Sequence, residues 1–145
     1  MDSEVTRVND ADAPVPLGHY VQATATPQGL VWISAQLPVG DGVTPESPVR
    51  AQARQALRNV LAIARRAGCG PEDVLRVTVY VTDVGTWSDV DLEFAEAFGA
   101  AKPARAVLGI NGLHHGFAIA VDAVAQGKWG NDATSGSPLD PPARG

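Results

Sequence analysis

Cysteine and positive charge are both scarce in this sequence, and each scarcity excludes a class of protein. The 145 residues include one cysteine, Cys69, so no internal disulfide can form. The 16 acidic residues outnumber the 11 Lys and Arg residues, which gives a formal net charge of −5 at pH 7. This balance argues against a nucleic-acid binder, because such proteins neutralise phosphates with clustered basic side chains.

A long apolar run and a leader-like N-terminus are also lacking. No apolar run approaches the ~20 residues that a membrane-spanning helix needs. The first residues, from Met1 to Glu4, are acidic and polar, which is the reverse of a secretory signal. We therefore expect a cytoplasmic protein with no membrane partner.

What is present suffices for one folded domain. Apolar residues make up 45% of the chain and charged residues 19%, which is typical of globular proteins. We place a single domain at residues 14–126, between a loose N-terminal segment at 1–13 and a flexible C-terminal tail at 127–145. The tail is rich in Gly, Ser and Pro and poor in large apolar side chains, so burial cannot offset its ordering entropy.

The hydrophobic period changes along this domain and predicts its elements. Alternating apolar residues indicate strands, and apolar residues three and four apart indicate helices. The expected elements are strands at 21–25 and 30–36, a helix from an N-cap at Ser47 to Gly68, a strand at 74–82, a helix from Thr86 that ends before Pro103, and strands at 105–110 and 117–125. This order predicts an α+β fold, with a sheet of five to six strands and two helices on one face.

Two helices can cover only one face of such a sheet, so the other face stays open. Alternation predicts that ten side chains point toward the helices: Leu75, Val77, Val79, Val81, Ala106, Leu108, Ile110, Phe117, Ile119 and Val121. The side chains expected on the open face are Tyr80, Arg105, Val107, Ala120, Asp122 and Val124. Because a monomer would leave this half-apolar face in water, we expect the chain to self-associate.

Six segments in unbroken order carry a family resemblance. They are LGHYVQA at 17–23, VWISAQ at 31–36, RQALRNV at 54–60, VTVYVTD at 77–83, PAR at 103–105 and VDAVA at 121–125. With these segments the chain resembles the Rid/YjgF family of reactive-intermediate deaminases. The resemblance implies a chorismate-mutase-like fold and a homotrimer with three clefts between its subunits. It further implies that these clefts hydrolyse 2-imino or enamino acids to 2-keto acids and ammonia, without a metal or an organic cofactor.

The resemblance also implies roles for individual residues. A guanidinium can bind a carboxylate through two parallel hydrogen bonds, and Arg105 stands where the family has the arginine that holds the substrate carboxylate. From the spacing alone, a surface arginine that balances an acidic protein is the favoured interpretation. The residues that the resemblance assigns to substrate binding are Tyr20, Ser34, Ala35 and Val107, the last two through backbone groups. Asp91 stands where an asparagine is common.

One departure from the family pattern concerns proton transfer. Ala120 stands where the active deaminases have a glutamate that is thought to activate water. Asp122 follows two residues later, on the same side of the strand and ~6.6 Å further along, and it is our second catalytic candidate; a structural role is the alternative. His114 and His115 are further candidates, although loop histidines are usually solvated.

Because this glutamate is missing, a second function is also possible. In this alternative the chain is a non-deaminating relative that binds or processes a small pathway-specific carboxylate. A third function, the ribonuclease or translation-inhibitor role ascribed to some family members, conflicts with the net charge of −5 and with the lack of a basic strip interleaved with aromatic residues.

Overall fold

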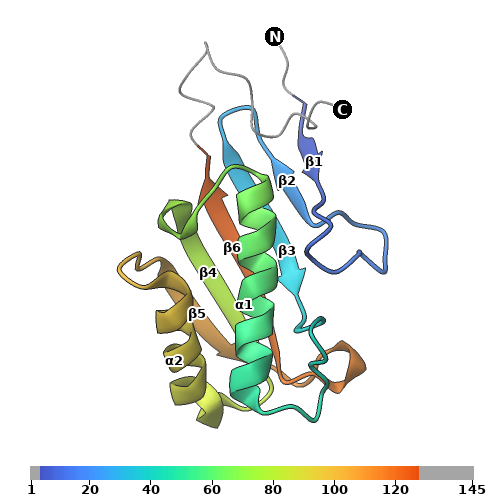
Figure 1. The fold of residues 1–145 in the computed structure, drawn as a ribbon, viewed down its shortest axis with the longest axis vertical. Helices are drawn as coiled ribbons and strands as arrows, with labels where there is room; N and C mark the ends of the chain where they lie inside the picture. Colours follow the sequence, from blue (N-terminus) through green and yellow to red (C-terminus); the bar gives the residue numbers. More distant parts are fainter. Residues whose placement is uncertain (1–3, 128–145) are drawn as a thin grey trace.

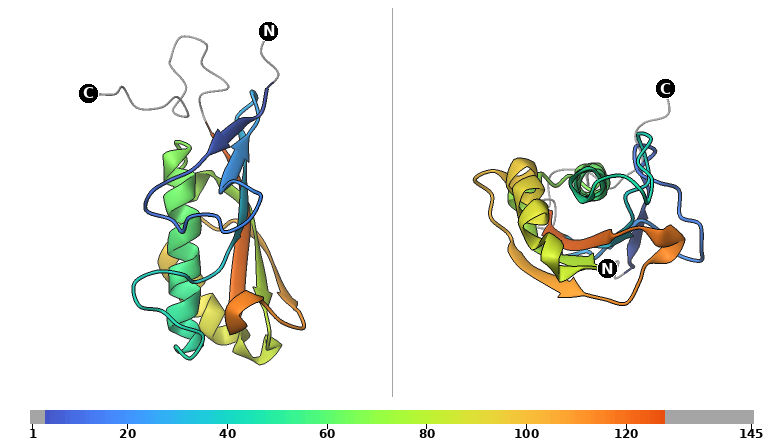
Figure 2. Two further views of the ribbon diagram at one scale, coloured as in Figure 1. Left: turned by 90° about the vertical axis from the view of Figure 1, so that its right-hand side faces the viewer. Right: turned by 90° about the horizontal axis from the view of Figure 1, so that it is seen from below.

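A six-stranded sheet with two helices against one face builds the molecule (Figures 1 and 2). The computed structural model describes residues 4–127, so the predicted tail lies outside the described residues except for Gly127. The elements are β1 (Thr6–Val8), β2 (Ala23–Ala25), β3 (Leu30–Gln36), α1 (Val49–Arg66), β4 (Val74–Val81), α2 (Trp87–Phe98), β5 (Ala104–Gly109) and β6 (Ile119–Gln126). The predicted α+β class, with both helices on one face, is confirmed.

The strand order is β1-β2-β3-β6-β4-β5, which puts β1 and β5 at the two edges of the sheet. Only the β4–β5 pair is parallel among these neighbours, and the chain passes through α2 to connect its two strands. The other neighbouring pairs are antiparallel. We call the face toward the helices the covered face and the opposite one the open face.

β1 is an edge strand that the sequence pattern does not predict. Its residues Thr6–Val8 pair with β2, and Val8 is buried. The expectation of a loose segment at 1–13 is therefore wrong for this strand. Three residues are too few to show an alternating pattern, and the buried amide of Gln22 supplies the missing tether. That amide accepts a hydrogen bond from the Asp10 N–H and donates one to the Asp10 carbonyl.

The C-terminal end of α1 matches the sequence prediction, whereas its N-terminal end does not. The helix begins one residue later than expected, because Pro48 is the N-cap and no side chain caps the first turn. The hydroxyl of Ser47 instead accepts a hydrogen bond from the Thr44 N–H at 2.9 Å. At the other end Gly68 has φ +80°, the left-handed conformation that a glycine adopts without side-chain strain, as predicted.

The apolar core fills the layer between the helices and the covered face. It contains the predicted stripe of α1 and the alternate residues of β4 and β6: Ala53, Ala56, Leu57, Val60, Val77, Val79, Val81, Ile119 and Val121. Leu75 was expected in this layer but is 49% exposed. The pairing of β4 with β6 shifts between Val74 and Arg76, and a bulge of this kind turns the residue between them out of the alternation.

The faces of β5 are the reverse of the prediction. In the parallel register Arg105 lies beside Val77, and Val107 lies beside Val79, so Arg105 and Val107 point to the covered face. Leu108 points to the open face and is 47% exposed. The prediction assumed that apolar residues alone face the helices. An arginine can do so as well, because its long stem is apolar and its planar head stacks on aromatic rings.

Candidate functional site

Arg105 projects from the edge strand β5 onto one side of α2. Its guanidinium carbon lies 4.7 Å from the centre of the Phe94 ring and 5.2 Å from that of Trp87. Its Nη1 donates a hydrogen bond to Oδ1 of Asp91 at 2.8 Å. The side chain is only 20% exposed. These contacts hold the cation in one place before any ligand arrives.

The contacts of Arg105 leave part of its guanidinium available. In the described part of the chain, Asp91 is the polar group bonded to Arg105, and it occupies Nη1 alone. The Nε and Nη2 groups therefore remain for a ligand. Arg105 and Asp91 line a cavity of about 470 Å³, which also includes Phe94, Lys102 and Pro103. This cavity offers a fixed fork of donors beside an apolar floor, which suits a planar acceptor such as a carboxylate.

Sequence reasoning missed the aromatic and acidic surroundings of Arg105. Trp87, Asp91 and Phe94 are spaced four and three residues apart, so they share one side of α2. That spacing was a usable signal once α2 was predicted. It was overlooked because Arg105 was expected on the open face, away from both helices.

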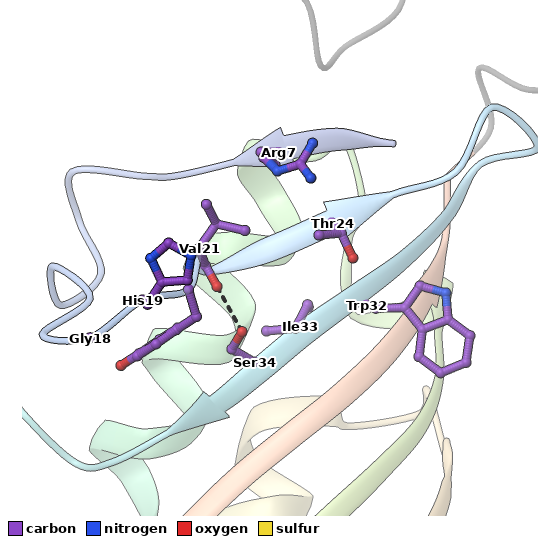
Figure 3. Close-up of a pocket in the computed structure, with 9 residues that line it drawn as sticks. Arg7, Gly18, His19, Val21, Thr24, Trp32, Ile33 and Ser34 are labelled. Atoms are coloured by element: carbon purple, nitrogen blue, oxygen red, sulfur yellow. Dashed lines mark hydrogen bonds between the residues drawn. The ribbon is translucent and has the colours of Figure 1, made fainter. Parts of the chain in front are cut away.

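Tyr20 and Ser34 lie at the other side of the molecule, near β2 and β3. A cavity of about 660 Å³ is lined by both residues and by Arg7, His19 and Trp32 (Figure 3). The Ser34 hydroxyl donates to the Val21 carbonyl at 2.7 Å, which fixes its position. A second cavity of about 270 Å³ also includes Tyr20, together with Ala35 and His115. Three of the four predicted substrate-binding residues are thus brought together.

Asp122 lies beside this group on the central strand β6. The pairing of β3 with β6 shifts between Ile33 and Gln36, so Ser34 and Ala35 both lie across from Asp122. Its Oδ2 accepts a hydrogen bond from the Tyr80 hydroxyl at 2.8 Å, and this bond raises the pKa of Tyr80 above its usual value. Ala120, which is buried, pairs with Tyr80 and contributes no ionisable group.

The predicted site residues and the neighbours of Arg105 therefore fall into two sets, which we call the two half-sites. The Tyr20 half-site comprises Tyr20, Ser34, Ala35 and Asp122, and the Arg105 half-site comprises Trp87, Asp91, Phe94 and Arg105. They lie on opposite faces of the sheet, with Arg105 on the edge strand β5. None of the three cavities described above includes members of both. Val107 lines none of these three cavities; its side chain packs against the core, and the role predicted for it concerns its backbone groups.

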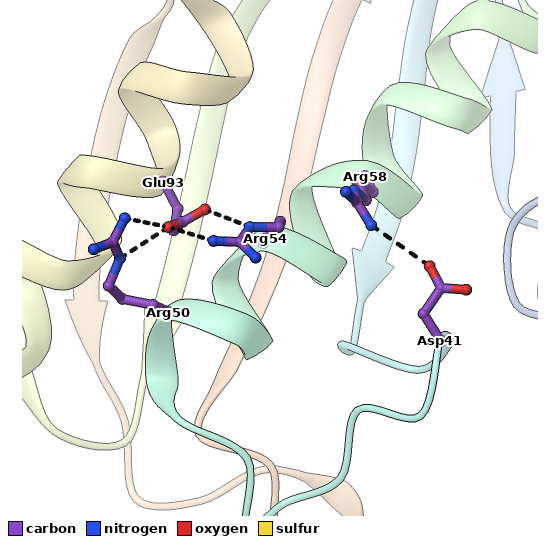
Figure 4. Close-up of polar contacts among 5 residues, drawn as sticks. All are labelled: Asp41, Arg50, Arg54, Arg58 and Glu93. Carbon is purple, nitrogen blue, oxygen red and sulfur yellow. Dashed lines mark hydrogen bonds and ion pairs between the residues drawn. The ribbon is translucent and has the colours of Figure 1, made fainter.

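A third polar cluster lies between the two helices and away from both half-sites (Figure 4). Glu93 of α2 is buried and accepts hydrogen bonds from Arg50 and Arg54 of α1 at 2.9 Å each. The bond from Arg54 is the main cause that lowers the pKa of Glu93, although burial opposes it. Because all three side chains are engaged with one another, we interpret this cluster as a link between helices.

Two further features concern residues 4–127 only. Within this range no cluster of three or more His, Cys, Asp or Glu side chains is arranged to hold a metal ion. Neither helix in the same range is long and apolar enough to cross a membrane.

Comparison with known proteins identifies the family. The family described as Endoribonuclease L-PSP matches residues 10–126. A RutC family protein from Pyrococcus horikoshii is 34% identical over 116 residues, which cover 79% of this chain and 91% of that protein. A Capra hircus protein named 2-iminobutanoate/2-iminopropanoate deaminase is 33% identical over 129 residues, or 86% of this chain and 93% of that protein.

A solved structure agrees with the sequence comparisons. The crystal structure of the yjgF gene product from E. coli superposes with a TM-score of 0.76 at 31% identity, over 84% of this chain and 98% of that one. The resemblance predicted from six sequence segments is confirmed, and the chain belongs to the Endoribonuclease L-PSP family, which includes the Rid/YjgF and RutC proteins.

Proposed function

We propose that this protein hydrolyses 2-imino or enamino acids to 2-keto acids and ammonia, in clefts between the subunits of a homotrimer. The proposal rests on the contacts and the available hydrogen-bond donors of the Arg105 guanidinium. This guanidinium is stacked on two rings and bonded to Asp91, yet its Nε and Nη2 groups have no partner among the described residues. Such a pre-positioned donor fork binds a carboxylate with little loss of side-chain freedom.

The separation of the half-sites supports a cleft between two copies. One chain keeps the Arg105 half-site and the Tyr20 half-site on opposite faces of its sheet. A second copy that packs its open face near the first can bring the Arg105 half-site of one subunit against the Tyr20 half-site of its neighbour. The open face suits this contact, because it presents Trp32, Val124 and Leu108 beside polar groups.

In the proposed reaction the protein mainly has to orient the substrate and transfer protons. Water adds to the C=N carbon, a C–O bond forms, and the nitrogen takes a proton to give a carbinolamine. The C–N bond then breaks, a C=O bond forms, and ammonia leaves. Arg105 holds the substrate carboxylate, and Asp122 of the neighbouring subunit accepts a proton from water and returns it to the nitrogen. Tyr20, Ser34 and Ala35 shape the opposite wall of the cleft.

The test is a direct assay with an unstable substrate. An amino acid oxidase generates 2-iminopropanoate from alanine in the cuvette, and the rate of 2-keto acid release is measured with and without the protein. We expect acceleration that depends on protein concentration and is lost in Arg105→Ala. No acceleration with any short-chain amino acid precursor, together with identical behaviour of Arg105→Ala, would exclude this function.

Ala120 favours a second candidate function. A buried methyl group stands on the strand next to the Tyr20 half-site, and it cannot exchange a proton. In this alternative the clefts bind or process a small pathway-specific carboxylate without deaminating it. The informative variant is Ala120→Glu. A large gain in imine hydrolysis over an inactive parent supports the alternative, whereas an active parent that gains nothing supports the deaminase.

A further inference from the structure

We propose that Asp91 is a specificity-determining residue, which makes the Arg105 half-site accept an uncharged carbonyl group as readily as a carboxylate. The inference rests on the proposed function only in assuming that ligands bind at Arg105. Its starting point is the bond of 2.8 Å between Asp91 Oδ1 and Arg105 Nη1. A carboxylate is already bound to the cation that would attract the ligand.

A ligand carboxylate on Nε and Nη2 would lie on the other edge of the same planar guanidinium from the carboxylate of Asp91. Two like charges ~6 Å apart, the span of one guanidinium with an acceptor on each edge, still repel each other in water, and more strongly when solvent is partly excluded. The cavity is partly enclosed, since the Arg105 side chain is only 20% exposed. Lys102 also lines this cavity, but it is exposed and makes no bond to Asp91 among the described residues. Asp91 thus offsets part of the attraction that Arg105 offers to an anion.

An uncharged acceptor escapes this repulsion. The carbonyl oxygen of an amide or ester can accept the same hydrogen bonds from Nε and Nη2 without placing a second negative charge beside Asp91. The predicted ligand class is therefore broader than 2-imino acids. It includes the imines of amino acid amides and esters.

Asp91 is not needed to hold Arg105 in position, and this separates the proposal from a structural role. The guanidinium stacks on Phe94 and Trp87, so the rings fix its plane without the acid. Asp91→Asn preserves the side-chain shape and keeps an oxygen that can accept from Nη1. The substitution removes the charge and little else.

The experiment measures binding rather than turnover, so that it is independent of the deaminase assay. The probes are 2-oxopropanoate and its amide, 2-oxopropanamide, which differ in charge and hardly in shape. Their dissociation constants are measured by calorimetry or ligand-observed NMR at low and constant ionic strength, because salt screens the repulsion. Arg105→Ala should abolish binding of both probes, which locates them at this half-site.

We expect Asp91→Asn to bind 2-oxopropanoate about tenfold or more tightly than the parent does, with the amide unchanged within about twofold. The matched control is Asp89→Asn, which removes the same charge from the first turn of α2 at an exposed position outside the cavity. It should change neither constant. Equal weakening of both probes in Asp91→Asn, an unchanged ratio of the two constants, or no binding of either probe to parent and variant overturns the inference. Failure of the imine assay with a shifted ratio overturns the proposed function alone.

Discussion

The Glu93 side chain is 1% exposed and forms ion pairs with two arginines of the neighbouring helix α1, Arg50 and Arg54. Glu93→Gln keeps its shape but removes the charge, so Arg50 and Arg54 face each other without a shared anion. Because both arginines are about half exposed, solvent softens the loss, and we expect the free energy of unfolding to fall by about 1–2 kcal/mol at pH 7. Urea unfolding measures this, with Glu96→Gln, an exposed neighbour on α2, as the control that should change little.

The pH dependence of the same variant follows from the lowered pKa of Glu93. A carboxyl whose pKa is lower in the folded than in the unfolded state stabilises the fold above the unfolded pKa of about 4.3. This stabilisation disappears as the pH falls through the folded pKa. The difference between parent and Glu93→Gln should thus be complete at neutral pH and shrink below about pH 4. A difference that stays constant into acid would contradict the ion pairing with Arg54 and Arg50.

Two conservative substitutions distinguish the role of Asp122 from that of its hydrogen-bond partner Tyr80. If Asp122 transfers the proton, Asp122→Asn should lower kcat for imine hydrolysis by about 10²–10⁴-fold with little change in KM. Tyr80→Phe keeps the carboxylate and should cost far less. Titration of tyrosine absorbance checks the bond itself, because its loss should bring the raised pKa of Tyr80 back toward the ordinary value. Similar, small kcat effects of both variants would assign Asp122 a structural role.

At the same scale, Arg105 illustrates what the sequence reveals about a site. The family resemblance identified the residue, but alternation placed it on the wrong face of the sheet. Residues 105–110 alternate only weakly in polarity. The register with β4 and the rings of Trp87 and Phe94 therefore decide to which face of the sheet the Arg105 side chain points. Neither is a property of the β5 segment itself.

Among the elements, α1 does more than cover the sheet, because a buried amide on it holds two other segments. Gln52 is 1% exposed; its Nε2 donates to the carbonyls of Pro45 and Ser47, and its Oε1 accepts from the Ala118 N–H. Gln52→Leu removes all three hydrogen bonds and leaves the half-buried backbone groups of Pro45, Ser47 and Ala118 without this partner. We expect the free energy of unfolding to fall by about 2–4 kcal/mol, measured by urea denaturation.

The control for this prediction lies on the same helix. Arg58 is mostly exposed, and its contact with Asp41 is long, at 3.6 Å. Arg58→Ala should therefore change the free energy of unfolding by no more than about 0.5 kcal/mol. An equal loss in both variants would mean that helix propensity, and not the buried amide of Gln52, sets the cost.

The long elements were predictable because their period is sustained, and the short ones were not. Eighteen residues of α1 repeat the apolar spacing of a helix, and β6 alternates over most of its length. β1 has three residues, and the bulges in β3 and β4 each interrupt the alternation at one point. A bulge depends on the partner strand, so the outward turn of Leu75 could not be read from its own segment.

For the whole molecule, the charge argues against RNA binding. Three arginines of α1 are already paired with carboxylates, Arg50 and Arg54 with Glu93 and Arg58 with Asp41. The net charge is −5. A shift assay at low salt should show no binding of single-stranded RNA, because the acidic residues outnumber the basic residues that could neutralise phosphates. Tight, salt-sensitive binding would instead favour the ribonuclease role.

The proposed division of the site between subunits can be tested by a complementation experiment. Arg105→Ala damages one half-site and Asp122→Asn the other, so each variant alone should be inactive in imine hydrolysis. When the two are unfolded together and refolded into mixed trimers, a cleft that pairs an intact Arg105 half-site with an intact Tyr20 half-site arises in about one case in four. Activity should therefore recover to about a quarter of the parent value, and sedimentation should report trimers throughout. Mixed trimers without any recovered activity would mean that Arg105 and Asp122 act within one chain or not at all, because only a cleft shared between two copies can reassemble a complete site from two broken ones.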